Sequence, residues 1–365
     1  MENKREKRIF PIHPAALVIL SLGLIGAVIH IFSLIFPAFA DFINDHPGAA
    51  LRFILAKIFD IIPFSFMEFL LYSSPVWIGT IAYLAIKVAG KGKVYIIRAV
   101  SSVLSVAALI YFFFAVGFAP GYRTTPLPEK IGLCEREVTS EELFETALIV
   151  IDELNALSEE IEYNIDGSSS MPFDLHKLSD DICICYEKVS EKYGYLTTFS
   201  SNIKPLIISP LMTYTHISGI YSFFTGEANL NTNYPDFVNV YTTAHEMAHQ
   251  RGISREDEAN FTAFLVCIES ESTYVRYSAY LNMFEYLSSA LYSADYNLWL
   301  DAYSHLSNKV SGELSAYSRF FDKYRESTAS RVTDSLNNAY LESQGTAGVR
   351  SYGMVVDLAV SYFLD

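Results

Sequence analysis

Three long apolar runs in the first third of the chain constrain its fold more than any other feature. They cover about residues 14–36, 64–86 and 100–118 of a chain of 365 residues. Each run is long enough to cross the hydrocarbon core of a bilayer as a helix, which takes about 20 residues. Because lipid offers the backbone no hydrogen-bond partners, such segments must be helical. We therefore predict a membrane domain with three transmembrane helices at residues 1–118.

Basic residues beside these runs indicate how the three helices are oriented. Lys and Arg gather at residues 4–8, before the first run, and at 87–98, between the second and the third, whereas the loop at 37–63 has fewer. Since loops rich in Lys and Arg stay in the cytoplasm, the N-terminus is predicted to lie inside and residues 119–365 outside. If residues 64–74 lay along the bilayer surface instead, two spans would place the C-terminal domain in the cytoplasm.

The charge balance changes after the third run, where an acidic and mainly helical domain is expected. Residues 1–118 carry ten basic and six acidic side chains, and residues 119–365 carry 16 basic and 35 acidic ones. Such a domain lacks the basic surface that nucleic acid binding requires, so we expect no nucleic acid partner. Helical periodicity predicts helices at 139–157, 175–193, 236–250 and from 269 to about 338.

An HExxH motif lies inside this domain, where residues 245–249 read His-Glu-Met-Ala-His. On a helix, two histidines four residues apart project from one face and can bind one zinc ion. The glutamate after the first histidine then lies beside a metal-bound water and can take its proton. We predict His245 and His249 as metal ligands and Glu246 as the catalytic base.

The residues after the motif predict where a third ligand comes from. Gly252 suits the left-handed residue that ends a helix, and Ser254, followed by acidic residues, suits the start of a second helix. The turn between them would bring the first turn of the second helix back beside His249. Glu256 shares a face with small residues that could pack against the motif helix, so we predict it as the third ligand. Glu258, on a more polar side, is the alternative.

Two resemblances rest on these residues. The run at 256–260, Glu-Asp-Glu-Ala-Asn, resembles the ExxAD segment of gluzincin membrane proteases, with Asn260 in place of the aspartate. The chain also resembles a bacterial membrane-anchored family of unknown function that has N-terminal membrane helices and a zinc-peptidase-like domain. The first resemblance places Glu256 in the metal position, and the second implies a metallopeptidase of a bacterial cell membrane. The segments that carry the second resemblance are 224–229, 244–252, 255–261 and 276–278.

Other residues are candidates for contact with the substrate or the ligands. Zinc peptidases bind an extended peptide against an edge strand, and Ile220–Asn229 is the candidate for that edge. Glu227 could meet a substrate amine, orient a residue of the site, or simply be exposed. A phenol from Tyr340 or Tyr352 could donate to the developing oxyanion. Asn260 could hydrogen-bond a ligand histidine and fix its tautomer.

The sequence therefore predicts a mainly α protein in two parts, the membrane domain at 1–118 and an extracytoplasmic zincin-like α+β domain at 119–365. The domain would hold the HExxH helix, a small sheet with an edge strand, and Zn²⁺. The expected reaction is hydrolysis of peptide bonds in a peptide or protein substrate by zinc-activated water. Two alternatives stay open, a non-enzymatic membrane sensor or scaffold that retains a zinc site, and an amidase acting on cell-wall peptides. The sequence specifies no substrate, disulfide pairing or oligomeric state.

Overall fold

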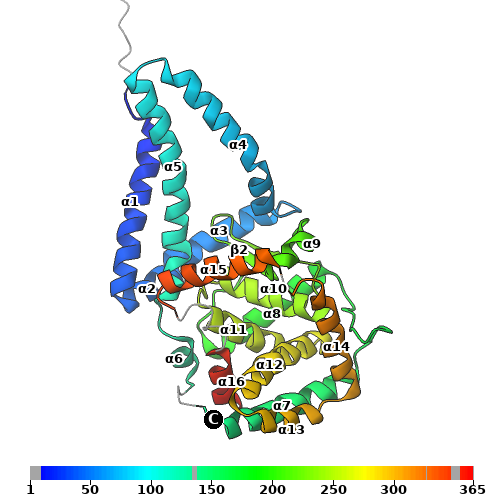
Figure 1. Ribbon diagram of the computed structural model, residues 1–365. Helices are drawn as coiled ribbons and strands as arrows, with labels where there is room; N and C mark the ends of the chain where they lie inside the picture. Colours follow the sequence, from blue (N-terminus) through cyan, green and yellow to red (C-terminus); the bar gives the residue numbers. More distant parts are fainter. Residues whose placement is uncertain (1–9, 134–137, 326, 347–353, 365) are drawn as a thin grey trace, which may run out of the picture.

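Three apolar helices project from one end of a mainly helical body in the computed structural model of the chain (Figure 1). The structure describes residues 10–133, 138–325, 327–346 and 354–364. Within these residues the only sheet has three short strands. The expectation of a mainly α protein with a small sheet is confirmed.

The projecting helices are α1 (Pro14–Ile35), α4 (Phe66–Ala89) and α5 (Lys93–Gly117), and all three are long and apolar enough to cross a membrane. Helices α1 and α5 pack along each other, whereas α4 diverges from α5 toward the body (Figure 1). Helix α5 begins seven residues before the predicted start. Its first turns carry Lys93 and Arg98, and a search for apolar runs excludes such charged residues. They can still belong to the helix, because long basic side chains at a helix end can reach the bilayer surface.

A bridge of helices connects α1 to α4 and lies against the body. It consists of α2 (Pro37–Ile43), a π-helical turn η1 (Asn44–Gly48) and α3 (Ala49–Asp60). Arg52 of α3 is 1% exposed, and its guanidinium donates to the backbone oxygens of Asn44, Gly117 and Arg251. One arginine therefore joins the bridge, the end of α5 and the loop that follows the HExxH motif. The division of the chain at residue 118 stays a prediction.

The body is built on a single large core in which α7 (Ser140–Ser158), α10 (Asp236–Gln250) and α12 (Thr273–Ala294) lie close together. Helix α10 is almost fully buried, because the sheet covers one side and α11 (Glu256–Ile268) and α12 cover the others. The remaining helices of the body are α6 (Leu127–Ile131), α8 (Leu175–Tyr193), α9 (Ser209–Met212), α13 (Tyr296–Ser304), α14 (Asn308–Asp322), α15 (Thr328–Ser343) and α16 (Val355–Leu364).

The long helical region expected after Glu269 is divided into four helices, α12 to α15. Asp295 ends α12 in an extended conformation and caps α13 through its side chain, and Ser307 and Ser327 cap α14 and α15 in the same way. Short polar side chains compete for backbone N–H groups, so they start new helices inside an otherwise periodic region.

The sheet has the strand order β1-β3-β2 and lies beside α10. Strand β3 (Glu227–Leu230) is central, parallel to β1 (Lys204–Pro205) and antiparallel to β2 (Gly219–Ser222). Only part of the predicted edge segment 220–229 is therefore an edge strand, namely the part in β2. Gly226 turns the chain between β2 and β3 with a φ of +70°, and a Cβ there would lie 2.7 Å from the side chain of Leu55 in α3.

Candidate metal centre

The turn between α10 and α11 positions the three predicted ligands. Helix α10 ends where the N–H of Gly252 donates to His249 and the N–H of Ile253 donates to Ala248. Gly252 has a φ of +99°, and a side chain at this position would collide with the Arg52 guanidinium. The glycine is thus required by both its backbone conformation and its neighbour. The turn brings the first residue of α11, Glu256, over the histidine face of α10.

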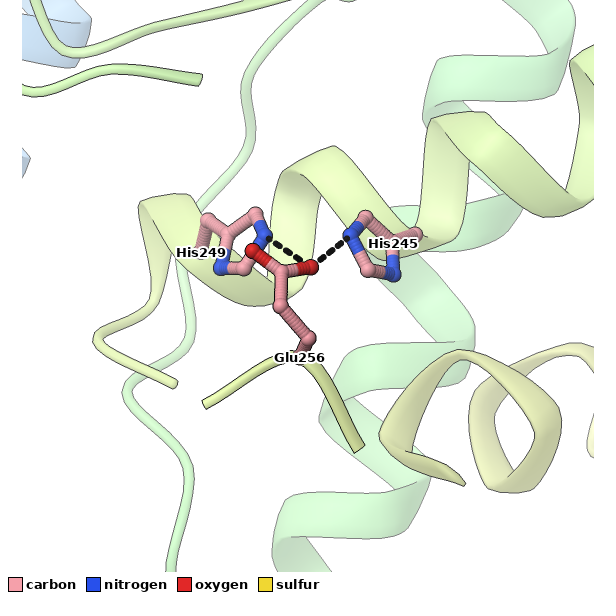
Figure 2. Close-up of side chains that lie close together, drawn as sticks. All are labelled: His245, His249 and Glu256. Carbon is pink, nitrogen blue, oxygen red and sulfur yellow. Dashed lines mark ion pairs between the residues drawn. The ribbon is translucent and has the colours of Figure 1, made fainter. Parts of the chain in front are cut away.

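Three side-chain atoms converge at this point (Figure 2). Glu256 Oε2 lies 3.3 Å from His245 Nε2 and 3.6 Å from His249 Nε2. One ligand atom from each residue lies within 4.8 Å of the others, a spacing that could hold a metal ion. Two imidazoles and one carboxylate form a ligand set typical of catalytic zinc, which keeps a fourth position for water or substrate.

The two histidines differ in how their other ring nitrogen is held. His249 Nδ1 lies 2.7 Å from the carbonyl oxygen of Ile253, so Nδ1 is a donor, and Nε2 faces Glu256, where it could bind a metal ion. His245 Nδ1 is buried and has no hydrogen-bond partner among the residues that the structure describes, and the same is true of Asn260 Nδ2. The hydrogen bond considered between Asn260 and a ligand histidine is not formed. Asn260 instead accepts the Tyr241 hydroxyl through its backbone oxygen, at 2.6 Å.

The three groups set up a strong local field. Burial alone would raise the pKa of the Glu256 carboxyl, but His249 and His245 hold it well below its usual range. Burial alone would lower the pKa of His249, but the charge of Glu256 and the hydrogen bond to it raise that pKa to about 9. A buried carboxylate beside two imidazole nitrogens also attracts a divalent cation to the same place.

Glu246 lies beside the ligands on α10 and faces the edge strand. Its side chain is 5% exposed, and burial raises the pKa of its carboxyl, against the lowering effect of His245 and His249. The carboxylate accepts a hydrogen bond from the Tyr221 backbone N–H. A Cβ on Gly219 would lie 2.5 Å from Glu246 Oε1, so only glycine lets β2 approach this closely.

Glu258, the alternative ligand, is engaged elsewhere. Its Oε1 accepts the backbone N–H of Leu127 at 2.8 Å and pairs with Arg255 Nη1 at 2.6 Å. Since α11 turns Glu256 toward α10, Glu258 two residues later is directed to the chain that leaves α5. Geometry thus separates the two carboxylates that helix-face reasoning left open.

Glu227 is a structural residue that joins the sheet to the start of α4. Its two carboxylate oxygens accept the N–H groups of Phe66 and Met67, each at 2.9 Å, at the start of α4. Glu68 of α4 in turn accepts the N–H groups of Ile207 and Ile208, also at 2.9 Å. Of the three roles considered for Glu227, contact with a substrate amine and simple exposure are therefore excluded by its 2% exposure and its two bonds to α4.

A cleft of about 1220 Å³ opens over the ligand triad and reaches the aromatic residues at the end of α5. Tyr340 of α15, a predicted oxyanion donor, lines this cleft. Burial and the charge of Glu256 raise the pKa of its phenol to about 12, against the lowering effect of a hydrogen bond with Tyr122. Tyr352 lies outside the described residues. Sequence reasoning missed Tyr286 of α12, which also lines the cleft and interacts electrostatically with Glu256. The available signal was its position away from the apolar stripe that Tyr277, Phe284, Leu287 and Leu291 form along α12.

The described part of the chain thus defines a class of protein: a helical body with an HExxH centre, attached to three apolar helices. The family model described as "Protein of unknown function (DUF3810)" matches residues 49–360, and the chain belongs to this family. The match begins at the first residue of α3, so α3 is part of the shared region, whereas α1, α2 and η1 lie before it. No curated protein and no solved structure matches the chain.

Proposed function

We propose that this protein is a membrane-anchored zinc metallopeptidase with a zincin-like, gluzincin-type site. The observation that supports the proposal most strongly is the convergence of His245 Nε2, His249 Nε2 and Glu256 Oε2, with the Glu246 carboxylate beside them and an open cleft above. A structural zinc site closes its fourth position with protein and needs no adjacent base. The open side of this centre therefore favours an enzyme over a sensor or scaffold that merely retains zinc.

The roles of the residues follow from their positions. Bound zinc would polarise the scissile carbonyl and make water acidic. Glu246, placed one residue after a ligand, accepts the proton of the attacking water and returns it to the leaving amine. The Tyr221 N–H holds its carboxylate in place. The phenols of Tyr340 and Tyr286 lie on the cleft walls, where an O–H group can donate to the oxygen of the reacting carbonyl.

Strand β2 supplies a place for an extended substrate. The carbonyl oxygen of Ser218 accepts the N–H of Asn231, so it points toward β3. Backbone groups of successive residues in a strand point to alternate sides, so the N–H and C=O groups of Gly219 and Tyr221 point away from β3. That side faces α10, because the Tyr221 N–H reaches Glu246. The Gly219 peptide group and the Tyr221 carbonyl can therefore pair with the backbone of a peptide lying along the cleft. A peptide bond is preferred over a cell-wall amide because this contact needs a continuous extended backbone.

Metal content tests the proposal directly. The full-length protein should bind about one zinc per chain. His245→Ala and His249→Ala should each reduce the zinc content, measured by metal analysis, to nearly zero. Glu256→Gln should lower the affinity for zinc by more than about tenfold, because even the loss of a residue that only hydrogen-bonds a ligand lowers it by about that much.

Glu258→Gln is the matched control on the same helix and should leave zinc content unchanged, because Glu258 bonds to Arg255 and Leu127. Zinc that persists in both histidine variants would refute the site. If Glu258→Gln loses zinc and Glu256→Gln keeps it, Glu258 and not Glu256 is the third ligand.

The location of the site depends on the orientation of the three helices. We propose a multi-pass protein of the bacterial cell membrane with residues 119–365 outside the cytoplasm, supported by the basic residues at 4–8 and 87–98. A phosphatase reporter fused after Asp365 should be active and a cytoplasmic fluorescent reporter dark. The opposite pattern would mean that one of the helices does not cross, and the substrates would then be cytoplasmic.

A further inference from the structure

One face of α12 forms a wall of the cleft, and it carries an acidic residue without a partner. Asn282, Glu285, Tyr286, Ser289 and Ser293 of this helix line the cleft. Glu285 is partly buried and forms no hydrogen bond or ion pair with any residue that the structure describes. It lies on a different helix from the ligand triad, and the proposed hydrolysis does not use it.

The composition of the cleft makes this carboxylate stand out. Among the described residues that line it there is no Lys or Arg, and the acidic ones are Glu285, Asp334 of α15 and, at the metal centre, Glu246 and Glu256. The walls are otherwise rich in aromatic rings, among them Tyr286, Tyr317 and Phe321. A negative and aromatic cleft favours a cationic group on its ligand.

Leaving Glu285 without a cation has a measurable consequence. Burial, with a smaller contribution from Glu313 of α14, raises the pKa of its carboxyl to about 8. The other titratable groups around it are Tyr286 on its own helix and Tyr317 on α14, and neither carries a positive charge. A cation placed beside the carboxyl would lower this pKa again, so binding of the cation and ionisation of Glu285 are coupled.

We propose that Glu285 is a specificity-determining residue that binds the cationic amine or guanidinium of a peptide substrate lying in the cleft. The cation is a Lys or Arg side chain or the free N-terminal amine, since the chemistry of recognition is the same. The assignment deepens the proposed peptidase function and rests on it, but binding can be measured without turnover.

The test uses the full-length protein in detergent, loaded with zinc and carrying Glu246→Gln to stop cleavage. Fluorescein-labelled alanine nonapeptides with one Lys at each position in turn are compared with the same peptides carrying norleucine, which has a similar shape and no charge. Each pair is measured by fluorescence anisotropy with a free and with an acetylated N-terminus. Lys at one position, or the free N-terminus, should tighten binding by about tenfold or more, the usual effect of one hydrogen bond to a charged group.

Glu285→Gln should abolish this preference, and Glu145→Gln, an exposed change on α7 away from the cleft, should leave it intact. The ratio of Lys to norleucine affinity should also rise between pH 6 and pH 8.5, because Glu285 becomes ionised over that range while Lys stays charged. Taking the ratio cancels titrations of the metal centre that affect both peptides.

Equal or absent binding of the paired peptides, or a preference that survives Glu285→Gln, would overturn the assignment. A preference that disappears with Asp334→Asn alone would also overturn it. The outcome is separate from that of the peptidase proposal: a Glu285-dependent preference in a protein that cleaves no peptide when Glu246 is intact would refute the hydrolysis alone. Cleavage without any preference for a cation would refute the role of Glu285 alone.

Discussion

Glu246→Gln is expected to keep about one zinc per chain and to lower the rate of peptide hydrolysis by about 10²- to 10⁴-fold. The glutamine has the size of the glutamate and can still accept the Tyr221 N–H through its amide oxygen. It cannot accept a proton from water at any ordinary pH. Zinc content and folding should therefore be preserved while proton transfer is lost. Metal analysis, thermal unfolding and cleavage of a peptide library, measured on the same preparation, check the three expectations together.

A matched change separates proton transfer from disturbance of the motif helix. Asn239→Asp alters a buried polar residue of α10 about two turns before Glu246, where the side chain bonds to Tyr234 and not to the centre. Its effect should be on stability, with hydrolysis per folded molecule retained. If Glu246→Gln kept the wild-type rate at full zinc occupancy, the protein would not be a peptidase of this type, and a sensor or scaffold with a zinc site would become the better explanation.

The parts of the fold that follow from local patterning were predictable from the sequence. Apolar runs of sufficient length indicated three helices able to cross a membrane, and a spacing of four residues placed His245 and His249 on one face of a helix. Gly252 predicted the turn that brings Glu256 over them, because few other residues adopt its conformation. The ligand cluster depends on contacts within about a dozen residues, and short-range rules are sufficient there.

The contacts that join distant segments could not be predicted in the same way. The partners of Glu227 are 160 residues away in α4, and a buried glutamate that accepts two backbone N–H groups looks like any other glutamate in the sequence. Glu285 and Tyr286 required knowledge of which face of α12 lies against the cleft. The apolar stripe showed only which face lies in the core. The choice between Glu256 and Glu258 was open because a small error in helix phase exchanges their directions.

Residues 119–365 alone are expected to be unable to reach the stability of the full chain. The bridge and the start of α4 hold several polar groups of the body that are otherwise shielded from water. Lys204 donates to the carbonyl oxygens of Asp60 and Ile62, and Asn202 bonds to the Asp60 carboxylate. Without residues 1–118, these groups and the Glu227 carboxylate would lose their partners. Water would replace the lost partners, so each hydrogen bond to a charged group would cost its net contribution of about 1.5–3 kcal/mol, which together is comparable to the whole stability of a typical domain.

The same interface can be tested in the full chain through Arg52, which reaches the Arg251 carbonyl just after the HExxH helix. Arg52→Met should lower the free energy of unfolding by about 3 kcal/mol, because the carbonyl oxygens of Asn44 and Gly117 lose their donor inside the protein. Lys91→Met, a change of the same kind in the exposed loop between α4 and α5, should have little effect. Thermal unfolding of both variants in detergent, followed with zinc release, gives the comparison. A fragment of residues 119–365 that binds zinc and unfolds at the temperature of the full chain would show that the bridge is dispensable. If instead the fragment fails and Arg52→Met releases zinc early, the metal centre is held in place by the segment that joins the apolar helices α1 and α4, and its geometry would respond to their packing.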